Sequence, residues 1–350
     1  MIITQTGGDN LFRYLTNRIL LALLTLFIIL SLSYILMRLA PGDPAKSQML
    51  GESQVQTEGL KADEGLSKAN VMREKLYLDK PVYVGLFYWF YGLLAHGDLG
   101  ESASVDKGRP VGELIMSRLP VTLRLNIIAV IITYILAIPL GVYSAIKPDT
   151  GLDRIITFCL FFLYSLPVFW VALMFQSGLC VGGLLPLFPL KGVASGDITG
   201  LSTSQIIWDY SRHYILPVIC LSYAGFAGLS RYARSGMLDV INQDYIRTAR
   251  AKGVPEYIVI FKHALRNAMI ILITLFAGIL PGLIAGSIIV EYVFSIPGMG
   301  DLSMMALSSR DYPLLMALFG FAGILTLGGI MISDILYVVA DPRISFDRSK

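Results

Sequence analysis

The segment from Asp244 to Gly253, DYIRTARAKG, combines several basic side chains with helix-ending residues. Asp244 can cap a short helix whose body runs from Tyr245 to Lys252. Gly253 and Pro255 can end it, because glycine accepts a left-handed backbone and proline cannot continue a helix. Such a short helix is not stable in water alone. It could dock into a groove on another protein or lie on anionic lipid headgroups, and the spacing leaves both open.

Other patterns that carry chemistry are missing from the sequence. The chain has no G-x-x-x-x-G-K-[ST] loop for ATP, no H-E-x-x-H and no G-x-S-x-G, so an enzyme is not expected. The cysteines and histidines lie far apart, which predicts no metal, cofactor or disulfide framework. They are Cys159, Cys180, Cys220, His96, His213 and His263. The net charge of +3 is not gathered into a stripe, which argues against nucleic acid as a partner.

The elements that position the basic segment are expected to be membrane helices. Hydrophobic residues make up 55% of the 350 residues and charged residues only 15%, where a soluble domain has about 25%. A membrane helix needs about 20 mostly apolar residues. Six runs qualify and predict an all-α polytopic membrane protein with six transmembrane helices. These runs are Ile19 to Met37, Leu125 to Ile146, Ile155 to Leu190, Tyr214 to Ser230, Asn267 to Val290, and Tyr312 to Ser333.

Basic residues in the short connections orient these helices. The connection from Arg231 to Arg266 has seven basic and three acidic residues, and the N-terminal tail has Arg13 and Arg18. The positive-inside rule therefore predicts that both termini lie in the cytoplasm. The first run is longer than a signal peptide core and is expected to be retained.

The aromatic segment from Pro81 to Gly97 is a seventh apolar stretch, with 17 residues free of charge. If this stretch were a span and the connection from Arg231 to Arg266 stayed in the cytoplasm, Arg13 and Arg18 would lie outside the cell membrane, against the positive-inside rule. Its aromatic residues, together with Gly85 and Gly92, are more typical of an interfacial helix, which is the interpretation preferred here.

Proline and glycine inside the apolar runs suggest close helix packing around a pathway. Prolines occur well inside four runs, at Pro139, Pro167, Pro217 and Pro281. Steps of four residues separate Gly278, Gly282 and Gly286, which predicts a face for close approach of another helix from this chain or from a second subunit. Glu291 is predicted at a helix end, close enough to the interface to remain charged.

Short strings along the chain resemble one family, the dipeptide, oligopeptide and nickel permeases of ABC importers. The stretch from Gln243 to Asn267, above all RTARAKG, is similar to the cytoplasmic EAA loop of these permeases, although Arg247 and Thr248 stand where the general pattern has Glu and Ala. The remaining strings follow in the family's order from about Leu15 to Phe346. They are PGDP at 41–44, YLDKPVY at 77–83, GDLGES at 97–102, RLPVTL at 118–123, IPLGV at 138–142, SLPVFW at 165–170, VEYVFSIPGMG at 290–300 and DPRISF at 341–346.

The resemblance implies a type I ABC importer permease in the inner membrane. Its coupling helix would contact a cytoplasmic ATPase through Asp244, Tyr245, Arg247, Thr248, Ala249, Arg250, Ala251, Lys252 and Gly253. Helix packing or the pathway would involve Gly278, Pro281, Gly282, Gly286 and Glu291. The implied partners are a second homologous permease, one or two ATPases, an extracytoplasmic solute-binding protein, membrane lipid and a peptide substrate. Nickel or another metal chelate is the alternative cargo, and a secondary carrier is a more distant alternative.

The predicted spans and their orientation also divide the chain. Residues 1–18 would form a cytoplasmic tail, 19–39 the first transmembrane helix, and 40–118 an extracytoplasmic segment with the interfacial helix. Residues 119–340 would form a five-helix permease core that contains the cytoplasmic coupling loop 236–266, and 341–350 would be a cytoplasmic tail. The polar insertion 47–67 has no recognised counterpart.

Overall fold

The computed structural model describes residues 6–39, 73–74, 77, 79–196 and 200–340. Within these ranges the regular elements are helices, with two isolated β-bridges that pair Glu101 with Pro110 and Cys180 with Phe188. This confirms the predicted all-α class. The described residues form two compact units, one with the residues up to Arg118 and Leu302–Leu327, the other with Leu119–Asp301 and residues 328–340. The predicted polar insertion 47–67 and the strings at 41–44 and 341–346 lie outside the described residues.

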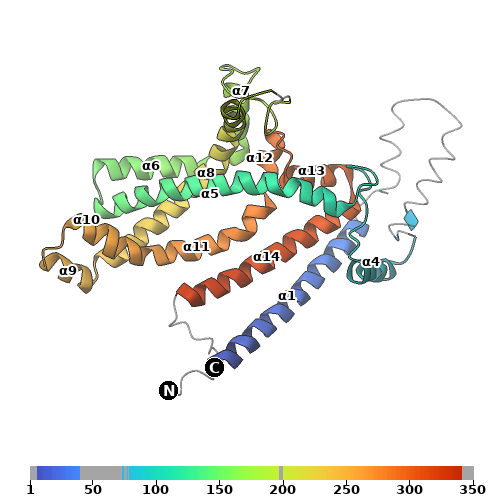
Figure 1. Cartoon of the computed structure of the whole chain (residues 1–350), viewed down its shortest axis with the longest axis horizontal. Helices are drawn as coiled ribbons and strands as arrows, with labels where there is room; N and C mark the ends of the chain where they lie inside the picture. Colours follow the sequence, from blue (N-terminus) through green and yellow to red (C-terminus); the bar gives the residue numbers. More distant parts are fainter. Residues whose placement is uncertain (1–5, 40–72, 75–76, 78, 197–199, 341–350) are drawn as a thin grey trace. The chain divides into compact units, whose positions relative to one another are not determined.

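The first unit is built around α1 (Thr6–Leu39), α4 (Val82–His96) and the first part of α14 (Tyr312–Ala340) (Figure 1). Its core contains the buried side chains of Leu30, Tyr34 and Met316, against which Trp89 and other apolar residues of α4 pack. The unit also contains the start of α5 (Val111–Ile146) and most of α13 (Met299–Ser309).

Helix α4 covers the aromatic segment that was predicted to be interfacial. It has 15 residues, fewer than the ~20 needed to cross a membrane, and it ends at Gly97 with a left-handed backbone. Tyr83, Phe87 and Leu94 are exposed on it. The helix is therefore too short for a straight span, and its place at the membrane interface stays a prediction.

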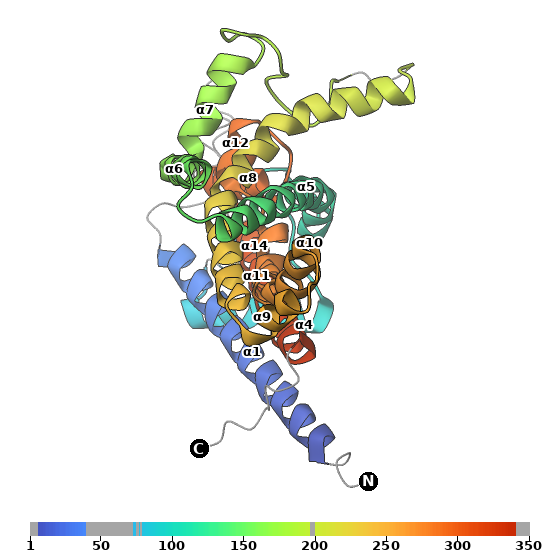
Figure 2. The same cartoon turned by 90° about the vertical axis from the view of Figure 1, so that its left-hand side faces the viewer.

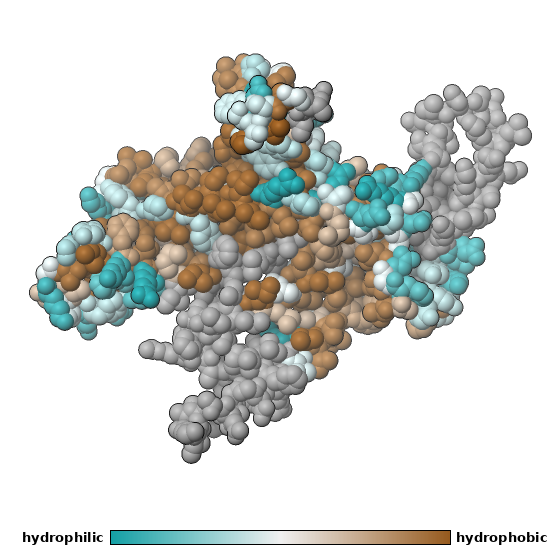
Figure 3. Space-filling model, viewed as in Figure 1, coloured by the Kyte–Doolittle hydropathy of each residue, from teal (hydrophilic) through white to brown (hydrophobic). Residues whose placement is uncertain are grey.

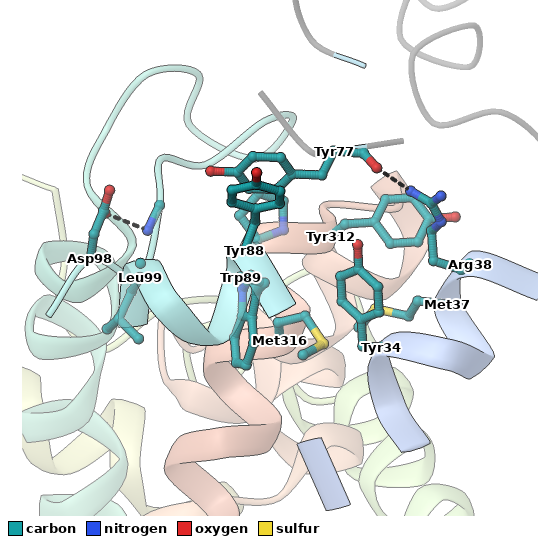
Figure 4. Close-up of a pocket in the computed structure, with 13 residues that line it drawn as sticks. Tyr34, Met37, Arg38, Tyr77, Tyr88, Trp89, Asp98, Leu99, Tyr312 and Met316 are labelled. Atoms are coloured by element: carbon teal, nitrogen blue, oxygen red, sulfur yellow. Dashed lines mark hydrogen bonds between the residues drawn. The ribbon is translucent and has the colours of Figure 1, made fainter. Parts of the chain in front are cut away.

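Two local arrangements hold the connections of the first unit in place. Asp311 is fully buried, and its Oδ2 accepts the Ser102 hydroxyl at 2.6 Å and the N–H of Ser104 at 2.9 Å. At the end of α1, Arg38 donates to the carbonyl oxygen of Tyr77 at 2.7 Å. Figure 4 shows this contact at the rim of an aromatic pocket of about 150 Å³, next to the stacked rings of Tyr77 and Tyr88.

The second unit contains the rest of α5, α6 (Gly151–Ser165), α7 (Val168–Leu179) and α8 (Thr203–Ile241). These are followed by α9 (Asp244–Ala251), α10 (Glu256–Ile258), the π-helix η1 (Val259–Ala264), α11 (Leu265–Ala285) and α12 (Ile288–Val293). Helix α8 is central, because α6, α7 and α11 all pack against it. The larger of its core clusters joins Leu125, Ala172 and Cys220 from α5, α7 and α8.

Prolines change the direction of the chain in this unit. The predicted third run is not one straight helix, because α6 and α7 meet at a bend of 92° at Leu166 and Pro167. The residue before proline avoids the helical region, which explains the break. Helix α8 also bends partway along its length (Figure 2), and Pro217 inside it lacks the N–H that would continue the backbone ladder.

The apolar helices agree in place with the predicted membrane spans. Among the described residues, four helices are long and apolar enough to span a membrane, and a fifth results if the bent pair of α6 and α7 is one span. These correspond to five of the six predicted runs. The remaining run falls on α11, where several side chains lie outside the described part. Figure 3 shows a continuous hydrophobic surface over α5 and α6, whereas hydrophilic residues gather around α9 and α10.

Candidate functional site

The short helix α9 is held in the second unit by one fully buried side chain. Ile246 is 0% exposed and contacts a cluster that includes Val142 of α5, Met237 of α8 and Ala268 of α11. Three long helices therefore meet at the residue that anchors α9. A displacement of α9 would be resisted by all three, because close-packed side chains transmit strain.

The outer face of α9 is polar and accessible. The side chains of Asp244 and Arg247 are 99% and 71% exposed, and their 3.8 Å ion pair is open to solvent. Tyr245 is 45% exposed, and its hydroxyl accepts a hydrogen bond from the amide of Asn267 at 2.7 Å. The eight-residue helix thus presents charged and hydrogen-bonding groups outward while its one apolar anchor points inward.

The ends of α9 differ slightly from the prediction. Asp244 is the first residue of the helix instead of its cap, and Gln243 takes the cap position without a side-chain hydrogen bond. The carboxylate in the first turn still complements the helix dipole. Lys252 is the C-terminal cap rather than part of the body. Gly253 follows with φ 77°, and its N–H donates to Arg250 at 2.9 Å, so the predicted left-handed end is confirmed.

An ion pair connects α9 to the next turn. Arg250 contacts Glu256 through two nitrogens, at 2.7 Å from Nη2 to Oε1 and 3.1 Å from Nε to Oε2. Hydrogen bonds from Arg250, together with its charge, hold the pKa of Glu256 below its ordinary value. The two side chains are 40% and 55% exposed, so this pair fixes geometry more than it adds stability. After Pro255 the chain enters the short helix α10, which begins at Glu256.

A π-helical turn joins α10 to α11. In η1 the N–H of Leu265 reaches the carbonyl of Ile260, five residues back, and Val259 and Ala264 are fully buried in the cluster around Ile246. Single π-helical turns are rare and often occur at functional sites. Composition alone gives no signal for this turn.

Only part of the predicted glycine face lies on a helix. Gly278, Pro281 and Gly282 lie within α11, but α11 ends at Ala285 and Gly286 follows it with φ 73°. The expectation that Gly286 continues the same helical face is therefore wrong. A Cβ on Gly286 would come within 2.5 Å of the Glu291 carboxylate and 2.9 Å of Thr122, so the close approach is to α12 and α5.

Glu291 is buried, contrary to the expectation of an accessible helix end. It is 0% exposed, and its Oε2 accepts N–H bonds from Gly300 at 2.7 Å and Asp301 at 3.2 Å. Its Oε1 accepts the hydroxyl of Thr122 at 3.1 Å. Buried carboxylates are stable only when hydrogen bonded in this way.

Sequence reasoning missed the residues that complete this corner. Thr122 also accepts the N–H of Met299 at 2.7 Å, which ties α5 to the start of α13. A Cβ on Gly298 would lie 2.4 Å from Glu291, and one on Gly300 would lie 2.7 Å from the backbone of Ile288. The glycines in the string SIPGMG were the available signal, because only glycine allows such close backbone approach.

Comparisons with known proteins cover nearly the whole chain. The sequence pattern of the family described as binding-protein-dependent transport system inner membrane component matches residues 137–346. The pattern of the N-terminal part of such membrane components matches residues 11–126.

Individual relatives are similar over almost their full length. The chain is 42% identical to the oligopeptide transport system permease protein AppB of Bacillus subtilis (strain 168), over 95% of this chain and 99% of the relative. It is 36% identical to a putative peptide transport system permease protein of Brucella abortus (strain 2308), with 95% and 98% covered. It is 31% identical to the inner membrane ABC transporter permease protein YejB of Escherichia coli O157:H7, with 95% and 99% covered.

These matches confirm the resemblance found in the short strings from 15 to 346 and place the chain in the inner membrane as a multi-pass transport component without catalytic activity of its own. The chain belongs to the family of inner-membrane components of binding-protein-dependent transport systems.

Proposed function

We propose that this chain is one permease subunit of an ATP-driven importer that takes up short peptides. Family membership supports the role in binding-protein-dependent transport. The peptide cargo is supported by the names of relatives that are 42% and 36% identical. Those names favour peptides over nickel or another metal chelate, the alternative that the sequence left open.

The observation that carries the energy-coupling part is the arrangement of α9. A single buried residue, Ile246, anchors the helix to α5, α8 and α11, while Arg247 and Tyr245 remain exposed. A docking helix needs this combination. Its partner must reach the outer face, and a displacement of the helix must be transmitted to the long helices that it contacts. Closure of a bound ATPase would then move three helices together and change access to the pathway.

The remaining components follow from this role. The chain contains no ATP-binding loop, so one or two cytoplasmic ATPases hydrolyse the nucleotide. A second, homologous permease completes the pathway, in part along the α11 face with Gly278, Pro281 and Gly282, and an extracytoplasmic binding protein delivers the peptide. The loop 236–266 and both termini lie in the cytoplasm, and the segment 40–118 lies outside.

Reversal of one exposed charge tests the docking role. Arg247→Glu inverts charge on the outer face of α9, at a side chain that is 71% exposed and whose 3.8 Å ion pair with Asp244 is open to solvent. The variant should insert and fold normally but lose most peptide-stimulated ATP hydrolysis, and peptide uptake should fall at least tenfold. Arg250 is a poorer choice because its replacement also breaks the contact with Glu256.

Arg154→Glu is the matched control, since Arg154 is an exposed arginine that lies in the first turn of α6 and is not part of α9. Both variants are measured in the complete transporter in proteoliposomes, with labelled dipeptide, longer peptide and nickel. Normal uptake by Arg247→Glu, or an equal loss in Arg154→Glu, would refute docking through α9. Uptake of nickel without peptide would reassign the cargo, and uptake that survives inactivation of the ATPase would refute the importer.

A further inference from the structure

A cleft of about 930 Å³ in the second unit lies between the C-terminal end of α7 and α12. Its lining combines apolar, hydrogen-bonding and charged side chains, among them Trp170, Gln176, Lys191, Tyr292, Ser295 and Asp301. The volume falls within the range typical of small-molecule sites, about 300–1,000 Å³. Neither the docking helix nor the buried Glu291 corner accounts for this cleft.

The cleft lies at the opposite end of the second unit from α9. Helix α8 begins at Thr203, after the loop that follows α7, and ends at Ile241, directly before α9. Figure 1 shows α7 and α12 together at one end of this unit and α9 at the other. Because α9 is proposed to face the cytoplasm, the cleft faces the extracytoplasmic side, where substrate arrives.

The first wall of the cleft places a positive charge beside α12. The N–H of Gly192, next to Lys191, donates to the carbonyl of Phe294 at 3.0 Å. The amide of Gln176 in α7 donates to the carbonyl of Val293 at 2.9 Å. These two contacts tie the Lys191 loop and α7 to the end of α12, so the lysine stem starts from a defined position.

The second wall carries a negative charge from the first turn of α13, where Asp301 also lines the cleft. The N–H of Asp301 donates to Glu291 at 3.2 Å, which fixes the first turn of α13 and with it the backbone that carries the Asp301 carboxylate. Glu291 therefore acts as a positioning residue for this wall. Ser295 lies between the two charged residues in sequence and has φ 49°, an uncommon backbone conformation for a serine.

Short peptides match this arrangement of groups. A free peptide carries an ammonium group, a carboxylate and polar amides, whatever its side chains are. Trp170 and Tyr292 are 46% and 56% exposed and offer flat faces on which varied side chains can pack. We propose that this cleft is an entry subsite for short zwitterionic peptides, in which Lys191 attracts the C-terminal carboxylate and Asp301 attracts the N-terminal ammonium group.

This inference rests on the proposed function, and its test separates the two. Peptide uptake by the complete transporter in proteoliposomes is measured with one tripeptide in three forms: unmodified, amidated at the C-terminus and acetylated at the N-terminus. The concentration of loaded binding protein is varied to give KM and kcat. The variants are Lys191→Gln and Asp301→Asn. The control Lys147→Gln removes an exposed lysine at the far end of α5.

Lys191→Gln should raise KM about three- to fivefold for the peptide with a free carboxylate and leave KM unchanged for the amidated form, as expected for a partly exposed charge pair. Asp301→Asn should raise KM for the free amine and not for the acetylated form. For each peptide the KM of the variant is divided by the KM of the wild type. Because the binding protein is the same in both, its selectivity does not affect this ratio. Ratios that are the same for all three peptides, or a similar change in Lys147→Gln, would overturn the entry subsite while the peptide importer stands. Failure of the wild-type transporter to take up any of the peptides would instead overturn the proposed function.

A second measurement covers peptides that the binding protein rejects. The tripeptide with a photoreactive phenylalanine analogue is cross-linked to the purified complex without binding protein, and the attachment sites are mapped by mass spectrometry. Attachment to α7 and α12 is expected, and it should diminish in Lys191→Gln. Attachment only elsewhere would overturn the subsite. Protection of Ser295→Cys from a water-soluble maleimide would also overturn it, because lipid or the second permease would then fill the cleft.

Discussion

Helix α9 and the Glu291 corner both bring charged residues to the end of a long helix, but they treat charge in opposite ways. In α9, Asp244 and Arg247 face solvent and the one buried anchor is apolar. In the corner, the carboxylate itself is buried and accepts bonds from Thr122, Gly300 and Asp301. Exposed charges remain available to a partner at little cost to folding. A buried carboxylate that is hydrogen bonded within the chain stabilises the fold and is not available to a partner.

The largest effect is expected at the buried corner. Glu291→Ala removes the acceptor of three donors, and each buried donor left without a partner costs about 1–3 kcal/mol. The variant should lower the thermal unfolding temperature of the detergent-purified chain markedly, and Glu291→Gln should fall in between because one oxygen remains. Fluorescence-detected unfolding of both, beside Arg247→Glu, measures this. If Arg247→Glu unfolds as early as Glu291→Ala, the contrast between the two regions is wrong.

An intermediate effect is expected at the end of α9. Gly253→Pro forces φ to about −65° where the chain has 77° and removes the N–H bond to Arg250, so α9 should lose its end and transport should stop. Gly253→Ala should cost only about 1–2 kcal/mol for the left-handed backbone, because its Cβ meets no atom within 4 Å. Uptake and limited proteolysis of the loop report on both. Equal loss of uptake in the alanine variant would contradict the expected difference between the two substitutions.

The smallest effect is expected from the exposed ion pair of Arg250 with Glu256. Because the pair lowers the pKa of Glu256, its contribution is present above the ordinary value of 4.5 and is lost as the pH falls through the lowered pKa. Its exposure limits the contribution to below about 1 kcal/mol. Wild type and Glu256→Gln should therefore differ slightly in unfolding temperature at pH 7, and the difference should shrink as the pH falls below 4.5. A difference that grows toward low pH would contradict this sign.

The parts of the molecule that local patterns determine were predictable. The segment from Asp244 to Gly253 gave the position of α9 and its left-handed end, because the helix signals lie within a few residues of one another. The apolar runs gave the membrane helices for the same reason. The ordered strings from 15 to 346 gave the family.

Features that depend on distant partners were not predictable. Glu291 was placed at an accessible helix end because nothing near it in sequence shows that Thr122, 169 positions away, bonds to it. Gly286 was assigned to a helix face by its four-residue spacing, although α11 ends before it and Gly286 lies where a Cβ would meet Glu291 and Thr122. Pro167 was noted inside the third run, but nothing near it in the sequence gives the 92° angle between α6 and α7, both of which pack on α8.

The π-helical turn η1 limits which insertions and deletions the chain can accept. An α-helix advances about 100° for each residue, so removing one residue between Val259 and Ala264 would restore ordinary helical winding and rotate everything before it relative to α11. Ile246 would then leave its place among α5, α8 and α11, although every hydrogen bond of a regular helix could form. The length of this turn therefore cannot vary without rotating the docking helix away from its partner, even where each side chain in the turn is kept.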